Sequence, residues 1–231
     1  ERVGGGRGGV RGGRADLGTV VEVAVGRGRA EWVVGPAVGA GLRAGRGEGW
    51  TWLLRGCRDA RMRQRVIDAR RQVERRTADK ETARSVLVVM GGTDPVGLAP
   101  AAVQLLAGTG MTLDVTAIAV GENAELVRDA ARDSALSLTV VAPVDDLAAL
   151  MSGQDLVVSA AGTSVWELCC IGVPMALIWV LDNQRDGYDR VVAAGAALGL
   201  GGPELGETDR HDNQPAVEPL RTALTDSRVR A

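Results

Sequence analysis

From Ser85 onward the chain alternates short apolar runs with amphipathic segments of helix length, five times over. Repeated strand–helix–strand units of this kind build a parallel sheet through right-handed crossovers, with helices on both faces. We therefore predict an α/β fold, a Rossmann-like, doubly wound parallel sheet, whose ligands bind outside the carboxyl ends of the strands. The expected strands are Ser85–Met90, Leu113–Val120, Leu136–Val141, Asp155–Ser159 and Met175–Val180, and the expected helices are Leu98–Ala107, Ala124–Arg132, Asp145–Met151, Val165–Ile171 and Arg185–Ala194.

The preceding segment differs in charge and composition. Residues 1–84 carry 19 Lys and Arg against 10 Asp and Glu, whereas residues 85–231 carry 8 against 19. Half of the 32 glycines fall in the first 50 positions, which leaves little apolar surface for a core. Val20–Val25 and Glu31–Gly35 are short strand candidates, and Arg58–Arg76 resembles an arginine-rich helix. We expect an incomplete or irregular N-terminal part (1–84), a folded domain (85–202) and a polar tail with a partial C-terminal helix (203–231).

The Gly/Arg repeats between Gly4 and Arg14 have three interpretations. They could be a poorly ordered segment, text read from another frame of GC-rich DNA, or a nucleic-acid arm of the RGG kind. Such arms interleave aromatic residues for base stacking, and none occurs here before Trp32. We therefore do not expect a nucleic-acid partner; strongly salt-dependent RNA binding would support that non-enzymatic alternative.

The stretch Ala160–Ser164, Ala-Ala-Gly-Thr-Ser, joins an expected strand to an expected helix through small residues only. The free N–H groups and the positive dipole end of a helix N-terminus suit a phosphate, and Gly162 lets the backbone approach it. The hydroxyls of Thr163 and Ser164 can add donors or cap the helix. Glu167, one turn later, would be repelled by a phosphate and suits a neutral diol such as ribose. The alternative is a capped helix with a solvated Glu167.

Two further loops follow expected strands and so share that edge of the sheet. The paired glycines of Gly91-Gly92-Thr93 can form an anion-binding nest, although paired glycines after a strand are more often a simple turn. Asp182, Asn183 and Gln184 place three hydrogen-bonding side chains where one or two would make an Asx turn, which favours sugar hydroxyls. The three loops together favour a ligand-binding edge.

Composition excludes several classes of protein. No apolar run approaches the roughly 20 residues of a membrane span, and no signal-peptide pattern is present. Three cysteines make no disulfide framework, and the single His211 excludes a histidine-based metal cluster, so we expect no metal and no cofactor. A reducing cytoplasm is the expected location.

Two stretches carry a family resemblance: Val86–Pro95, with the sequence VLVVMGGTDP, and the long block from Asp145 to Gln184. They resemble the C-terminal half of a GT-B fold, and most of all the UDP-sugar hydrolases of pseudaminic acid biosynthesis with their spore-coat polysaccharide relatives (PseG/SpsG-like). The resemblance covers about Ser85 to Gly202. The wider relationship is to the GlcNAc transferase that forms lipid II, so a GT-B glycosyltransferase with a UDP-sugar donor is the alternative.

The resemblance implies a role for each matching position, with a UDP-sugar as the partner. The backbone near Val144 would meet the uracil, and Glu167 the ribose hydroxyls. The diphosphate-binding residues would be Gly162, Thr163 and Ser164, the sugar-binding residues Asp182, Asn183 and Gln184, and the residues facing the cleft Gly91, Gly92 and Thr93.

The family's catalytic histidine lies in an early Gly-x-Gly-His loop, and nothing between Glu1 and Arg84 matches that loop. His211 lies in the expected polar tail, where a solvated role suits it better than that of a base. We therefore leave the catalytic residue unassigned, and whether this chain is an enzyme stays open. The expected function is a UDP-sugar-binding protein that resembles the hydrolase releasing a diacetamido-trideoxy sugar from UDP.

Overall fold

The computed structural model describes residues 20–22, 32–35, 52–55, 62–73, 82–91, 94, 96–207 and 214–230. The chain forms two compact units, Glu1–Arg61 and Met62–Ala231. The first contains a three-stranded parallel sheet in the order β1 (Val20–Glu22), β2 (Trp32–Gly35), β3 (Trp52–Arg55). Both N-terminal strand candidates therefore form strands, and β3 is an addition that the apolar pattern did not predict.

The second unit is built on a six-stranded, all-parallel sheet in the order β6-β5-β4-β7-β8-β9. This confirms the Rossmann-like, doubly wound fold, and the five predicted strands are all present within two or three residues of their expected ends. The sixth strand, β9, was not predicted. The bounds are β4 (Ser85–Val89), β5 (Leu113–Ile118), β6 (Leu136–Val141), β7 (Leu156–Ala160), β8 (Met175–Ile178) and β9 (Leu198–Gly201).

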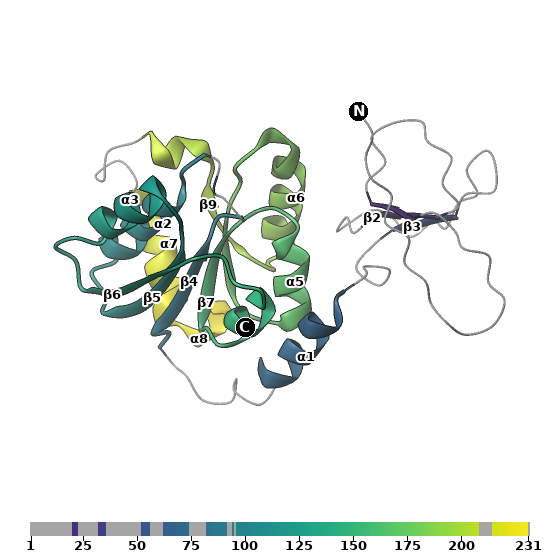
Figure 1. Cartoon of the computed structure of the whole chain (residues 1–231), viewed down its shortest axis with the longest axis horizontal. Coiled ribbons are helices and arrows are strands. Elements are labelled where there is room, and N and C mark those ends of the chain that lie inside the picture. The colour runs from purple at the N-terminus through teal and green to yellow at the C-terminus, as the bar shows by residue number, and fades with distance from the viewer. Residues whose placement is uncertain are drawn as a thin grey trace. The chain divides into compact units, whose positions relative to one another are not determined.

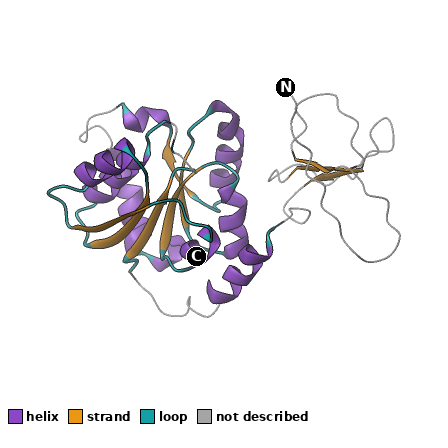
Figure 2. Cartoon of the chain, viewed as in Figure 1, coloured by secondary structure: helices purple, strands orange, loops and turns teal. Residues whose placement is uncertain are grey.

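Helices cover both faces of this sheet (Figures 1 and 2). In Figure 1, α2, α3 and α7 lie on one side, and α5 and α6 lie on the other. The five predicted helices are confirmed, but α6 begins at Asp182 rather than near Arg185, so the predicted Asp-Asn-Gln loop is in fact the first turn of that helix. The bounds are α1 (Gln64–Val73), α2 (Ala99–Gly108), α3 (Glu122–Ala130), α4 (Leu147–Ser152), α5 (Ser164–Ile171), α6 (Asp182–Ala193), η2 (Pro203–Gly206), α7 (Gln214–Thr225) and α8 (Ser227–Arg230).

The strands alternate between the two helical layers. Val86 and Val88 of β4 are fully buried in the core that also holds the apolar residues of α2, α3 and α7. Leu87 and Val89 are buried too but stand outside that core, because successive side chains of a strand point to opposite faces. A strand covered on both faces needs apolar residues throughout, which is why unbroken runs marked these strands in the sequence.

Helix α1 belongs to the second unit although it precedes the first predicted strand of that unit. Its buried residues Val66, Ala69 and Val73 recur at helical spacing, and the helix packs against α4 and α5. The boundary between the units therefore falls at residue 61, where the charge and composition pattern placed it near residue 84.

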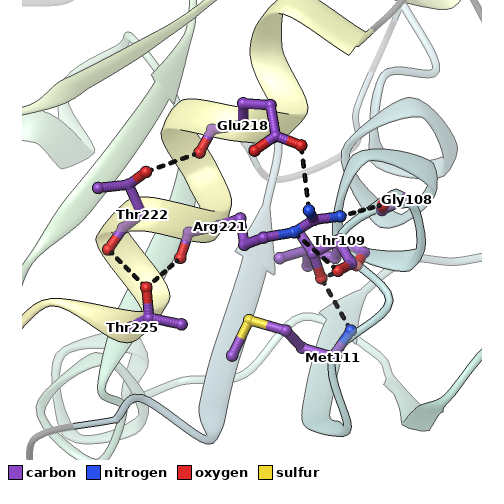
Figure 3. A network of polar contacts seen from close by, with 8 residues as sticks. Gly108, Thr109, Met111, Glu218, Arg221, Thr222 and Thr225 are labelled. Atoms are coloured by element: carbon purple, nitrogen blue, oxygen red, sulfur yellow. Dashed lines mark hydrogen bonds and ion pairs between the residues drawn. The ribbon is translucent and has the colours of Figure 1, made fainter.

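Helix α7 lies in the segment that was expected to be a polar tail, yet Val217, Leu220 and Leu224 are buried in the main core. Polar contacts hold it there (Figure 3). The Arg221 guanidinium donates from Nε to the carbonyl of Thr109 at 3.0 Å, just after α2 ends, and pairs with Glu218 of its own helix at 3.1 Å. The Ala83 N–H also donates to the Leu224 carbonyl at 2.9 Å. The C-terminal segment is thus part of the domain.

Candidate functional site

The order of the six strands reverses between β4 and β7, which pair in the middle of the sheet. Crossovers leave the sheet in opposite directions on either side of such a point, so their loops diverge and open a crevice at the carboxyl edge. The loop after β4 contains Gly91, and the loop after β7 contains Gly162. Two of the three loops that were predicted to bind a ligand therefore follow the two strands at this point.

The loop after β7 is short and leads directly into α5. The last residue before the helix, Thr163, makes no side-chain hydrogen bond to the first turn, so the hydroxyl cap considered from the sequence is not formed. Gly162 and Ser164 are half-buried, and Thr163 is exposed. An N-terminus without a side-chain cap, reached through residues this small, is suited to bind an anion.

The first turn of α6 lies beside this loop. Gln184 accepts a hydrogen bond from the Val180 N–H at 2.9 Å through Oε1, which fixes the direction of its amide. Its Nε2 lies 3.5 Å from the position that a Cβ on Gly162 would occupy. The structure therefore brings the predicted sugar-binding Gln184 next to the predicted phosphate-binding loop, while Asp182 and Asn183 are exposed on the same helix start.

Glu167, in the first turn of α5, is held by a partner that sequence reasoning did not find. The Arg63 guanidinium donates from Nη2 to Glu167 Oε1 at 2.6 Å. Arg63 comes just before α1, 104 positions earlier in the chain, so no local pattern signalled the pair. The Glu167 side chain is only 18% exposed, and Arg63 is 69% exposed. Glu167, the residue predicted to bind the ribose, is thus a mostly buried carboxylate whose charge is balanced by Arg63.

The loop after β4 has a different chemistry. Asp94 is 5% exposed and its carboxylate accepts hydrogen bonds from the N–H groups of Leu98, at 2.9 Å, and Ala99, at 2.8 Å. The Asn123 amide donates to the Asp94 carbonyl at 3.2 Å. Gly91 has a φ of 81°, a conformation that glycine adopts without strain. Gly92 and Thr93 lie outside the described residues. Because Asp94 already places a carboxylate at the start of α2, this helix start is poorly suited to a second anion.

A small pocket opens at the same edge, where the loops after β4, β5 and β6 meet. Val144, the residue predicted to meet the uracil through its backbone, lies beside Pro143 in the loop after β6 and is 40% exposed. The pocket is lined by Gly91, Asp94, Ile118, Ala119, Val120, Asn123 and Pro143. Among the described predicted residues, Gly91 lines this pocket and Val144 follows the lining residue Pro143, whereas the others lie at the starts of α5 and α6.

The described part of the chain contains neither a cluster of metal-binding side chains nor a membrane-spanning helix. Among those residues no group of three or more His, Cys, Asp or Glu side chains is placed to hold a metal ion, and His211 is outside them. No helix found there is long and apolar enough to cross a bilayer.

Some known proteins resemble this chain in sequence, and others resemble it in structure. No protein-family model matches the sequence. The chain is 30% identical to the spore coat polysaccharide biosynthesis protein SpsG of Bacillus subtilis over 132 residues, which cover 54% of this chain and 38% of SpsG. It is 23% identical to an uncharacterised protein of Methanocaldococcus jannaschii over 135 residues, 55% of this chain and 27% of that protein. The chain thus matches well under half the length of either relative.

Among solved structures, MurG of Acinetobacter baumannii superimposes with a TM-score of 0.58 and 19% identity, covering 85% of this chain and 54% of MurG. That likeness concerns the fold. The expected resemblance to an SpsG-like protein, with the Rossmann-like fold of one half of a GT-B protein, is confirmed.

Proposed function

We propose that the unit from Met62 to Ala231 binds a UDP-sugar at the carboxyl edge of its sheet, as the nucleotide-binding half of an SpsG-like nucleotide-sugar enzyme. The observation that carries this proposal is the α5 start, which lacks a side-chain cap and lies within contact of Gln184. A diphosphate needs N–H donors and positive potential, whereas a sugar needs directed neutral groups. Both are present side by side.

Each predicted residue then has a role in this proposal. The diphosphate lies on the backbone of Gly162, Thr163 and Ser164, and Glu167 accepts hydrogen bonds from the ribose hydroxyls. The sugar contacts Asp182, Asn183 and Gln184, which form the first turn of α6. The uracil lies against the loop at Val144.

In this proposal Gly91, Gly92 and Thr93 would line the same crevice from the other side; of the three, the structure describes Gly91. Since Asp94 occupies the α2 start, we assign the phosphates to the α5 start and leave the Gly91 loop to line the nucleotide.

Isothermal titration calorimetry of the full chain with UDP tests this function. We expect saturable binding, and the absence of heat at millimolar UDP would contradict the proposal. Pyrophosphate and uridine, titrated separately, divide the binding energy between the phosphates and the nucleoside.

Turnover is a separate question from binding. Release of the sugar by water needs a positioned base, which typically contributes about 10²- to 10⁴-fold to the rate, and the Gly-x-Gly-His loop of the hydrolases has no match in this sequence. We expect the 231-residue chain to bind UDP-sugars yet release no free sugar above background. Fusing residues 53–231 to an N-terminal domain bearing that loop should restore hydrolysis. Turnover by the unmodified chain that is abolished in His211→Ala would identify His211 as the base and contradict this expectation.

A further inference from the structure

The ion pair between Arg63 and Glu167 has a geometry that the proposed function does not by itself require. A ribose-binding carboxylate needs only to reach the diol, whereas here it is held at 2.6 Å by a guanidinium from a different part of the chain. The inference that follows rests on the proposed function, because Glu167 is the residue assigned to the ribose.

Arg63 is presented by a fixed segment. Helix α1 begins one residue later and is anchored through the buried side chains of Val66, Ala69 and Val73. Arg65 donates to the Asp145 carbonyl at 3.0 Å, and Gln72 accepts from the Ser152 hydroxyl at 3.0 Å, so α1 is tied to α4 at both ends. The Arg63 guanidinium therefore meets Glu167 from a backbone whose place is set by packing.

Glu167 can serve two partners at once. A carboxylate has two oxygens and about four acceptor positions, and the contact with Arg63 uses Oε1. A charge-assisted hydrogen bond is shorter and stronger than a neutral one, so it restricts the rotamers of the Glu167 side chain. The second oxygen, Oε2, is therefore left to accept a hydrogen bond from a ribose hydroxyl.

We propose that Arg63 is a positioning residue that holds the Glu167 carboxylate aimed at the ribose diol of the nucleotide. It acts through Glu167 and contacts neither the phosphates nor the sugar. Recognition of a ribose, as opposed to a deoxyribose, thereby depends on α1 as well as on the loop that follows β7.

The competing assignment is that Arg63 leaves Glu167 when a ligand arrives and binds the diphosphate itself. Its side chain is exposed enough to move. The two assignments differ in the ligand part that Arg63 affects, so a set of ligands separates them.

The test measures the affinities of UDP, 2′-deoxy-UDP and pyrophosphate for the full chain and its Arg63→Gln, Arg63→Lys and Glu167→Gln variants. Arg71→Gln is the matched control, because it removes the same charge from α1, the helix that follows Arg63, at a residue paired with Asp68 of that helix. The Arg71 side chain is 64% exposed, so this control substitution should leave thermal unfolding unchanged.

We expect Arg63→Gln to weaken UDP about tenfold and pyrophosphate less than about twofold, in line with the loss of one charge-assisted hydrogen bond. The variant should also discriminate less between UDP and 2′-deoxy-UDP. Arg63→Lys, which keeps the charge without the planar fork, should recover part of the affinity. The double variant with Glu167→Gln should bind no more weakly than Glu167→Gln alone, because both changes act on one interaction.

Each other outcome overturns a particular statement. An equal loss for UDP and pyrophosphate would make Arg63 a phosphate ligand, and unchanged or tighter UDP binding by Arg63→Gln would show that the ion pair does not position Glu167. In both cases wild-type UDP binding keeps the proposed function intact. If the wild-type chain itself binds no UDP, the proposed function fails and this inference fails with it.

Discussion

Helices α2 and α5 begin at the same edge of one sheet, after the neighbouring strands β4 and β7, yet their first turns are completed in opposite ways. Before α2, the buried carboxylate of Asp94 accepts hydrogen bonds from the backbone N–H groups of Leu98 and Ala99. Thr163 leaves α5 without a side-chain cap. A helix start that already contains an anion is a structural element, and one that lacks it remains open to a ligand. A single carboxylate therefore separates a scaffold loop from a candidate binding loop.

The largest expected effect comes from making the α5 start resemble the α2 start. Thr163→Asp places a carboxylate at the N-cap, where it accepts from the first-turn N–H groups and repels a diphosphate. We expect UDP affinity to fall about 100-fold or more, while thermal stability stays equal or rises, because Asp is a favoured N-cap residue. Calorimetry and thermal unfolding measure the two quantities.

Thr163→Asn is the matched control, with a similar shape and no charge, and should lose much less affinity. If Thr163→Asp binds UDP with wild-type affinity, the phosphates do not bind at the α5 start, and the proposed functional difference between α2 and α5 is wrong.

The second effect concerns what lies one turn into α5. Glu167→Ala removes hydrogen bonds between a charged group and the ribose, each worth about 1.5–3 kcal/mol, so UDP should bind about 10- to 100-fold more weakly. Pyrophosphate binding should change little. Glu125→Ala, which removes an exposed glutamate of α3, serves as the control and should leave both affinities unchanged. Equal losses for UDP and pyrophosphate would show that Glu167 does not bind the ribose.

The third prediction concerns Asp94, the buried carboxylate at the start of α2. Asp94→Ala leaves two buried N–H groups of α2 without their acceptor and should lower the free energy of unfolding by about 1–3 kcal/mol. For a domain of this size, each kcal/mol shifts the melting temperature by about 2–4 °C. Asp94→Asn keeps one acceptor oxygen and should lose less. UDP affinity measured well below the melting temperature should be unchanged in both variants, and a large loss of it would make Asp94 part of the binding site.

The smallest expected effect concerns Tyr188 of α6, which is part of neither the α2 start nor the α5 start. Burial, and to a lesser degree the nearby Asp189 and Glu204 carboxylates, raise the pKa of Tyr188, whose hydroxyl accepts from the Gly201 N–H at 3.1 Å. Above about pH 10, where an unperturbed tyrosine ionises, the unfolded chain releases a proton that the native state retains. Stability should therefore fall as pH rises through that range. Urea unfolding at several alkaline pH values should show a shallower fall in Tyr188→Phe, and identical slopes would contradict it.

Much of the fold could be predicted, because a buried parallel strand needs an unbroken apolar run and leaves that mark in the sequence. Strand β9 escaped prediction since Leu-Gly-Leu-Gly combines two apolar residues with two glycines of low strand propensity. Helix α7 does carry a signal. Ala216, Val217, Leu220, Ala223 and Leu224 recur at helical spacing, but two prolines and many polar neighbours obscured it.

The candidate site was predictable only in its local parts. Gly162 and Gln184 were identified because each follows a strand, and parallel strands end at one edge. Asp94 stands four residues before Leu98, the N-cap residue of α2, and so outside the position at which Asp is favoured; no capping pattern pointed to it. The pairing of Arg63 with Glu167 spans 104 positions and depends on how α1 packs, which no short-range pattern encodes.

The hydrogen bond from Arg221 to the Thr109 carbonyl, at the end of α2, also bears on the order in which the domain folds. Arg221 reaches residues that precede it by more than 110 positions, and Leu220 and Leu224 fill the core beside strands made much earlier in synthesis. Such distant contacts are slow to form, because a long loop must close before any contact compensates for its lost entropy. Until residue 224 has left the ribosome, the surfaces of α2 and β9 that α7 contacts lack this cover. Docking of α7 is therefore expected to be a late step in the folding of this unit, and the apolar surface that it covers is open to aggregation before that step.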